Sequence, residues 1–147
     1  MTSRPFRPLV AALLMVPFAL GGATAAGATH RRAAVTPVGT WRWSDNDEAL
    51  ATPRNPHDLH VRARGHGRGL IARFGHGGWV PFTWRPARHT FVFTATRRVG
   101  PHGNRRLAVT YTGRVALVRG RWTATGRLRI ASPGFPGRSS FTATRAG

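Results

Sequence analysis

The chain has 147 residues, of which 23 are basic and four are acidic, giving a formal net charge of +19. All basic residues other than histidine are arginine, and the chain contains no cysteine. This composition excludes disulfides, thiolate metal ligands and a cysteine nucleophile, and the length allows a single domain. Such a domain is held together by packing and sheet hydrogen bonds alone.

The start of the chain has the order of a secretory signal peptide. Arg4 and Arg7 supply a positive beginning, residues 9–20 form an apolar run, and small residues follow. The run is shorter than the roughly 20 residues that span a bilayer as a helix. We therefore expect cleavage after Ala25 or Ala28, export to the periplasm or medium, and no transmembrane span after cleavage. An uncleaved membrane anchor is the alternative.

Beyond a short polar leader, apolar and polar residues alternate in short segments, as expected for strands with one buried face. The clearest segment is 121–130, and its Thr-Ala-Thr phrase recurs near residues 95 and 143. The strands that we expect are 39–43, 59–64, 70–74, 79–84, 89–98, 107–118, 121–130 and 139–145. Residues 44–56 are expected to form a loop with one helical turn capped by Asp45 or Asn46, and Gly113 is expected to mark a bend or bulge.

The strand spacing of about a dozen residues, without an amphipathic helix, predicts an all-β fold. We expect an antiparallel meander closed as a barrel of about eight strands, with a β-sandwich as the alternative. Closure is favoured because it removes exposed strand edges. The residues expected inside are Phe93, Val109, Trp122, Leu128 and Phe141. The predicted organisation is a signal peptide over 1–28, a flexible leader over 29–37 and the barrel over 38–147.

The opening Gly39-Thr40-Trp41 is similar to the Gly-x-Trp that begins the first strand of lipocalins and avidin-like proteins, the calycin barrels. The rest of the mature chain resembles small secreted bacterial barrels of unassigned function, on phrases such as Tyr111-Thr112-Gly113 and Thr125-Gly126-Arg127. The resemblance implies an up-and-down barrel with a cavity for a small molecule. It implies no activity, and Trp43 stands where an avidin-type site has a polar ligand-binding residue.

No pattern in the chain predicts catalysis. Of the four carboxylates, Asp45, Asp47 and Glu48 share one loop, whereas acid–base pairs converge from separate elements. We interpret that loop as a solvated turn paired with nearby arginines. The seven histidines are scattered, and two arginines between His60 and His66 would repel a metal cation. We therefore predict no catalytic residues, no metal and no cofactor.

Two binding hypotheses remain. The first is a non-catalytic barrel that holds a small apolar or anionic ligand, because some inward aromatic side chains would line a cavity; packing in the core is the alternative reading of the same residues. The aromatic residues that we select as cavity candidates are Trp41, Trp43, Trp79, Trp84 and Tyr111.

The second hypothesis is non-specific binding of anionic polymers, such as envelope polysaccharide, lipid headgroups or nucleic acid, by outward-facing arginines. The anion-contact candidates are Arg62, Arg64, Arg121, Arg127 and Arg129. No element able to read bases is evident, so no specific nucleic-acid partner is expected. A solvated surface, or the codon bias of a GC-rich genome, would also explain the arginines.

Overall fold

The computed structural model describes residues 34–67, 69–133 and 137–147. The predicted signal peptide and the first part of the leader lie outside these residues. The described residues belong to one compact unit. No helix within the described ranges has the length and apolar character needed to cross a membrane.

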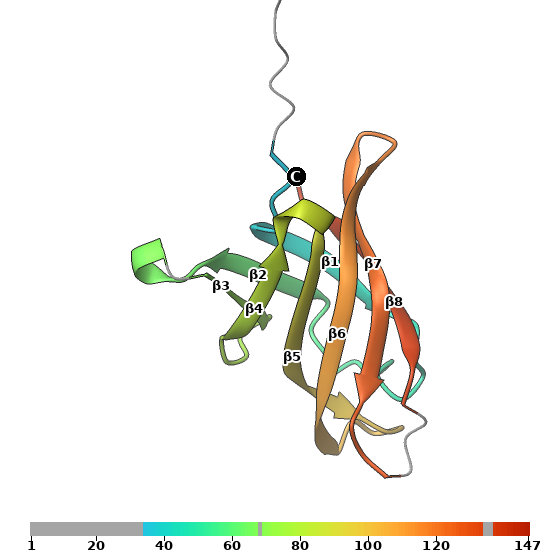
Figure 1. Ribbon diagram of the computed structural model, residues 1–147. Coiled ribbons are helices and arrows are strands. Elements are labelled where there is room, and N and C mark those ends of the chain that lie inside the picture. The colour runs from blue at the N-terminus through green and yellow to red at the C-terminus, as the bar shows by residue number, and fades with distance from the viewer. Residues whose placement is uncertain (1–33, 68, 134–136) are drawn as a thin grey trace, which may run out of the picture. The chain divides into compact units, whose positions relative to one another are not determined.

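Eight antiparallel strands form a closed barrel in which each strand pairs with its neighbours in the chain (Figure 1). The strands are β1 (Gly39–Asp45), β2 (Asp58–Ala63), β3 (Leu70–Phe74), β4 (Val80–Arg85), β5 (Thr90–Val99), β6 (Arg105–Val118), β7 (Arg121–Ile130) and β8 (Ser139–Arg145). Two single 3-10 turns, η1 (Gly65–Gly67) and η2 (Pro86–Arg88), follow β2 and β4. The predicted meander barrel is confirmed, and the sandwich alternative is wrong.

Pairing between the first and last strands closes the barrel. β1 pairs with β2 on one side, where Trp41 lies opposite Leu59, and with β8 on the other, where Trp41 lies opposite Arg145. Each strand has two neighbours, so the sheet has no free edge. The closed architecture is the one that the calycin resemblance implied.

Aromatic rings fill the middle of the barrel. Trp43 stacks on Phe141 with ring centroids 4.3 Å apart, and it makes T-shaped contacts with Phe74, Phe93 and Tyr111. Four of the five predicted interior residues, Phe93, Val109, Leu128 and Phe141, are buried, whereas Trp122 near the start of β7 is half-buried. Edge-to-face and offset contacts of this kind add to the stabilisation from apolar burial.

The long strand β6 runs without a bulge, which was one of the two alternatives expected at Gly113. Its register with β5 and β7 is continuous, and Gly113 lies opposite both Phe91 and Gly126. A Cβ at Gly113 would come within 2.6 Å of the Phe141 ring and 2.7 Å of the Phe91 ring. The glycine therefore makes room for two core aromatic rings instead of breaking the strand.

The described end of the leader contacts the barrel. Val35 packs against the core, and Pro37 is buried and accepts a hydrogen bond of 2.8 Å from Trp41 Nε1. The indole of the Gly-x-Trp opening is thus satisfied by the chain immediately before β1. Gly39 adopts a φ of +138°, and a Cβ there would meet the Arg145 guanidinium at 2.9 Å.

Candidate functional site

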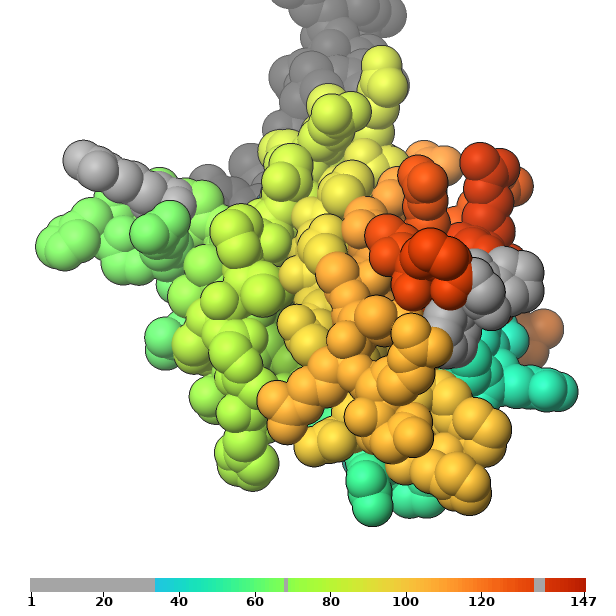
Figure 2. All heavy atoms as spheres, turned by 90° about the horizontal axis from the view of Figure 1, so that it is seen from below, coloured from blue at the N-terminus to red at the C-terminus, as the bar shows by residue number. Residues whose placement is uncertain are grey.

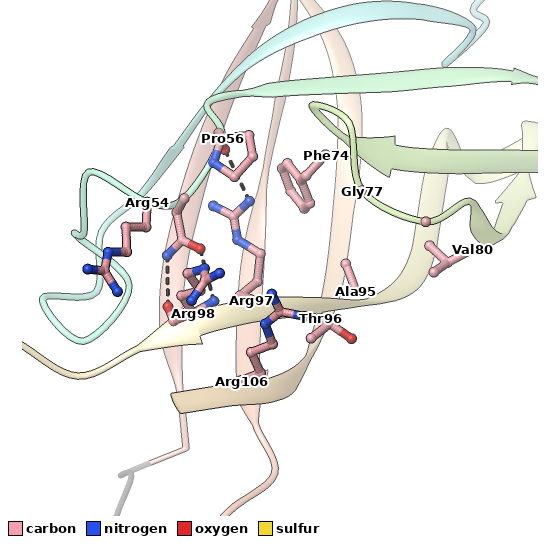
Figure 3. A pocket seen from close by; sticks show the side chains of 12 residues that line it. Arg54, Pro56, Phe74, Gly77, Val80, Ala95, Thr96, Arg97, Arg98 and Arg106 are labelled. Carbon is pink, nitrogen blue, oxygen red and sulfur yellow. Dashed lines mark hydrogen bonds between the residues drawn. The ribbon is translucent and has the colours of Figure 1, made fainter. Parts of the chain in front are cut away.

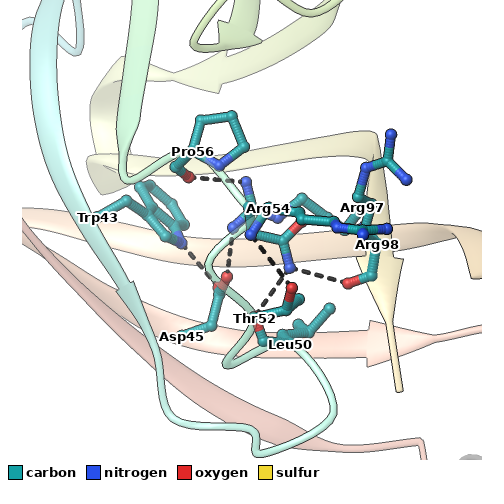
Figure 4. A network of polar contacts seen from close by, with 9 residues as sticks. Trp43, Asp45, Leu50, Thr52, Arg54, Pro56, Arg97 and Arg98 are labelled. Atoms are coloured by element: carbon teal, nitrogen blue, oxygen red, sulfur yellow. Dashed lines mark hydrogen bonds and ion pairs between the residues drawn. The ribbon is translucent and has the colours of Figure 1, made fainter. Parts of the chain in front are cut away.

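One opposite-charge pair lies inside the barrel. Asp45 ends the inward row of β1, and Arg97 occupies the inward row of β5 that also holds Phe91, Phe93 and Ala95. Arg97 Nη2 donates to Asp45 Oδ2 at 2.8 Å, and only 2% and 5% of the arginine and aspartate side chains are exposed. Figure 4 shows the pair between the two strands. A buried carboxylate and guanidinium are tolerated only when they neutralise each other.

Further contacts hold both partners in place. Trp43 Nε1 donates to Asp45 Oδ1 at 2.9 Å, so both carboxylate oxygens are occupied. Arg97 Nη1 donates to the Pro56 carbonyl at 3.1 Å, and its guanidinium carbon lies 3.9 Å from the centroid of the Phe74 ring. The pair is therefore a fixed element of the fold, and much of the Arg97 charge is neutralised within it.

Tyr111 faces this pair from β6. Its hydroxyl is buried and has no hydrogen-bond partner within the described residues. Burial raises the pKa of the phenol above its ordinary value, Arg97 opposes that rise and Asp45 adds to it. The hydroxyl consequently stays protonated while the barrel is folded.

The acidic loop differs from its predicted form. We interpreted Asp45 as part of a solvated turn, but it is buried because the alternation of β1 continues two residues further than expected and directs this carboxylate inward. The single helical turn is present, with Ala51 N bonded to the Asp47 carbonyl at 3.0 Å. It is capped by the Asp47 side chain, which accepts from Ala49 N at 2.9 Å, and not by Asp45 or Asn46.

Asn55 fastens the end of this loop to β5. Its side-chain nitrogen donates to the carbonyls of Leu50 and Arg98, both at 2.8 Å, and its oxygen accepts from Arg98 N at 3.0 Å. The amide thus pairs with the Arg98 backbone as a neighbouring strand would. Only 3% of Asn55 is exposed, so these hydrogen bonds are shielded from water and fix the loop against the barrel end.

A pocket of about 430 Å³ lies where this loop, the β3–β4 turn and the β5–β6 end meet. Figure 2 views the barrel end where the green β3–β4 segment and the yellow end of β5 come together. We call this pocket of about 430 Å³ the arginine pocket. Its lining residues are Arg54, Asn55, Pro56, Phe74, Gly77, Gly78, Val80, Ala95, Thr96, Arg97, Arg98 and Arg106.

The lining divides into a basic side and an apolar side (Figure 3). Arg54, Arg98 and Arg106 lie on one side, and Phe74 and Val80 lie on the other. The Arg98 guanidinium donates to the Gly103 carbonyl at 3.3 Å, whereas the guanidinium groups of Arg54 and Arg106 have no carboxylate partner in the described part of the chain. No lining residue is acidic. Such a site attracts anions and offers planar, multidentate donors.

The aromatic cavity candidates do not gather in one cavity. Trp41, Trp43 and Tyr111 are packed in the core, and the space beside the two tryptophans is about 10 Å³, no more than one water molecule needs. Trp84 is half-buried and stacks on His89, with centroids 6.3 Å apart. Trp79 is half-buried on the outer wall, in contact with two arginines.

The anion-contact candidates are all exposed and lie on different parts of the barrel. Arg62 is on β2, Arg64 follows it, and the three others are Arg121, Arg127 and Arg129 on β7. None of them lines the arginine pocket. Among the described residues, no three histidine or carboxylate side chains converge on a point that could hold a metal ion.

The chain matches no protein-family model, no curated protein and no solved structure.

Sequence reasoning missed all four arginines of the pocket. A signal for one of them was available, since Arg97 continues the inward row of Phe91, Phe93 and Ala95 at two-residue spacing. The other three arginines lie at the pocket only because the 46–57 loop and the turn at Gly77 fold back over the barrel end. No local pattern encodes that path.

Proposed function

We propose that this protein is an exported, non-catalytic binding protein that holds a small anionic ligand in the arginine pocket. The main support is the lining of one pocket of about 430 Å³, which contains four arginines and no acidic residue. The arginines are Arg54, Arg97, Arg98 and Arg106. A volume of this size lies in the range of small-molecule sites. The similarity of Gly39-Thr40-Trp41 to the opening of lipocalin and avidin-like barrels supports a binding role.

The lining also favours a particular kind of anion. The ligand's charged group would lie against Arg98 and Arg106, and an apolar portion would lie against Phe74 and Val80. Guanidinium groups bind carboxylates and phosphates through paired N–H donors, and apolar contact adds affinity without demanding further polar partners. The expected class is therefore a compact carboxylate or phosphate with a short apolar body.

Pre-organisation supports the same proposal. Asn55 fixes the loop, and Arg97 is anchored by Asp45 and by the Pro56 carbonyl. A ligand entering this pocket would order few groups, which reduces the entropic cost of binding. The lining contains no carboxylate, histidine, serine or tyrosine that would supply a nucleophile or general base, so we propose binding without turnover.

The test is a thermal-shift comparison of matched ligands on the mature chain. 3-Phenylpropionate should raise Tm, because a ligand that binds only the folded state stabilises it. The neutral isostere 3-phenylpropan-1-ol and the short acid acetate should raise it less. An equal effect of the alcohol would indicate an apolar site, and no effect of any anion at millimolar concentration would reject the proposal.

A second candidate, anionic-polymer binding, is favoured by a separate observation. Strands β5 to β8 contain no carboxylate, and Arg127 on β7 lies between Thr112 of β6 and Ser140 of β8. Arg129 lies opposite Thr110 and Arg114 opposite Thr125. The outer face of β5 to β8 presents guanidinium groups among hydroxyls, and no acidic residue on these strands neutralises them.

A further inference from the structure

Two guanidinium groups meet on one indole ring on the outer wall of the barrel. The guanidinium carbon of Arg62 lies 4.1 Å from the centroid of the Trp79 ring, and that of Arg73 lies 4.6 Å from it. Contacts at these distances are attractive cation–π interactions. They bring two positive charges to the same aromatic ring.

The register shows that this cluster faces outward. Leu59 and Val61 are buried on β2, and Ala72 and Phe74 are buried on β3. Arg62 and Arg73 occupy the alternate positions, so their side chains lie on the other face. His60 lies opposite Arg73, and its Nδ1 shares a hydrogen bond of 3.1 Å with the Thr40 hydroxyl. None of these residues lines the arginine pocket, so the two sites are separate.

Neither guanidinium is paired with a carboxylate in the described part of the chain. Asp58, on the same strand as Arg62, lies opposite Arg42 of β1. Arg73 Nε is moreover buried without a hydrogen-bond partner. The Arg73 guanidinium has therefore lost part of its hydration without gaining an anionic partner, a state that a bound anion would relieve.

The geometry also restricts the anion. A guanidinium stacked on an aromatic ring keeps its N–H donors in its own plane, free at their outer edge. Two such groups place two positive charges and several N–H donors beside one ring, whereas a carboxylate makes its bidentate contact with one guanidinium only. A dianion matches this pair better than a monoanion.

We propose that Arg62, Arg73 and Trp79 form a second site, which binds a phosphate dianion. The bound group is either inorganic phosphate or the terminal phosphate of a monoester, since both present the same three or four oxygens. Trp79 acts as the platform that sets the two guanidinium planes, and the arginines supply the charge.

The experiment follows the indole N–H of Trp79 and the Nε–H of Arg73 by nitrogen–proton correlation spectroscopy on the mature protein. Inorganic phosphate and glycerol 3-phosphate are titrated separately at mildly alkaline pH, where both are dianions. Acetate at matched ionic strength is the control. We expect saturable shifts of both signals with one or both phosphates and only weak shifts with acetate. A monoester that binds more tightly identifies an ester as the source, and tighter binding of inorganic phosphate identifies the free ion.

Variants separate this site from general charge attraction. Arg62 is exposed, so Arg62→Gln should leave the fold intact and weaken phosphate binding about tenfold or more, because a charge-assisted hydrogen bond is lost. Trp79→Leu should weaken it through loss of the platform. Arg88→Gln removes the same charge from the exposed turn η2 and should leave the affinity unchanged. Equal affinity for acetate, or equal weakening by Arg88→Gln, would overturn the proposal.

Discussion

Asp45 and Arg97 form an ion pair of 2.8 Å inside a barrel whose other central residues are mostly aromatic. They come from β1 and β5, strands that are not neighbours in the sheet. The pair therefore bridges opposite parts of the barrel wall next to the arginine pocket, to which Arg97 also contributes. Because Arg97 belongs to both the ion pair and the pocket lining, loss of the pair would affect the stability of the fold and the shape of the pocket together.

Breaking this pair from one side should be strongly destabilising. Asp45→Asn keeps an acceptor for Trp43 Nε1 but leaves the Arg97 charge without its partner, which costs about 3–5 kcal/mol of unfolding free energy. Urea denaturation measures the loss. Asp58→Asn, at an exposed aspartate, is the matched control and should be nearly neutral.

The double variant Asp45→Asn with Arg97→Met should lose less stability than Asp45→Asn alone, because no uncompensated charge remains buried. A double-mutant cycle in urea gives the coupling energy between the two side chains. Strict additivity of the two single changes would contradict the account of a coupled pair.

Tyr111 should make the protein unstable at high pH. Burial raises its pKa above the ordinary value of 10.0, so the unfolded chain releases this proton at a lower pH than the folded barrel does. The contribution of the neutral phenol to the unfolding free energy is fully present below pH 10. Above pH 10 it is lost by about 1.4 kcal/mol per pH unit. Tyr111→Phe should abolish this dependence.

The measurement is direct because Tyr111 is the only tyrosine in the chain. The ultraviolet absorbance of the ionised phenol should appear together with loss of folded circular dichroism as pH rises. Phenol ionisation near its ordinary pH in a protein that remains folded would show that the hydroxyl is not buried as described.

Gly126 should not tolerate a methyl group. A Cβ there would overlap the Thr112 carbonyl oxygen and the Gly113 Cα, and would come within 2.8 Å of the Phe141 ring. Gly126→Ala should therefore lower the unfolding free energy by about 1–3 kcal/mol through overpacking. Gly78→Ala, where a Cβ has open space, is the control and should change stability little. Equal stability of the two variants in urea would contradict the packing described for β6 and β7.

Binding of anionic polymers to the outer wall should be electrostatic. We expect the mature protein to bind DNA and an acidic polysaccharide at low salt and to lose most of that affinity at physiological salt, because each phosphate contact releases condensed counterions. Titration at the two salt concentrations measures this. Affinity that survives physiological salt and prefers one polymer would reveal a specific site instead.

Much of the fold follows from two-residue alternation. Segments such as 121–130 and 139–145 show one apolar face, and their number and spacing predict a closed meander. The bulge expected at Gly113 is wrong because the reason for a glycine at this position is tertiary: the rings of Phe91 and Phe141 occupy the space that a side chain would need. Periodicity alone carries no information about which strands approach each other across the barrel interior.

The same limit explains the candidate site. Asp45 and Arg97 each continue an inward row, so their burial was predictable, but their contact depends on the shape of the closed barrel. Arg54 and Arg106 join the pocket only through the course of a loop and a hairpin end. The surface arginines selected from the sequence are exposed as their alternation indicates, yet none of them lies at the pocket.

The most direct test of the arginine pocket is isothermal titration calorimetry with 3-phenylpropionate at physiological salt, comparing two double variants. Arg54→Gln/Arg106→Gln and Arg127→Gln/Arg129→Gln remove the same charge from exposed arginines, the first pair at the pocket and the second on β7. Our account predicts saturable binding that the pocket variant weakens about tenfold or more and the β7 variant leaves unchanged. Equal affinity of the two variants would contradict it.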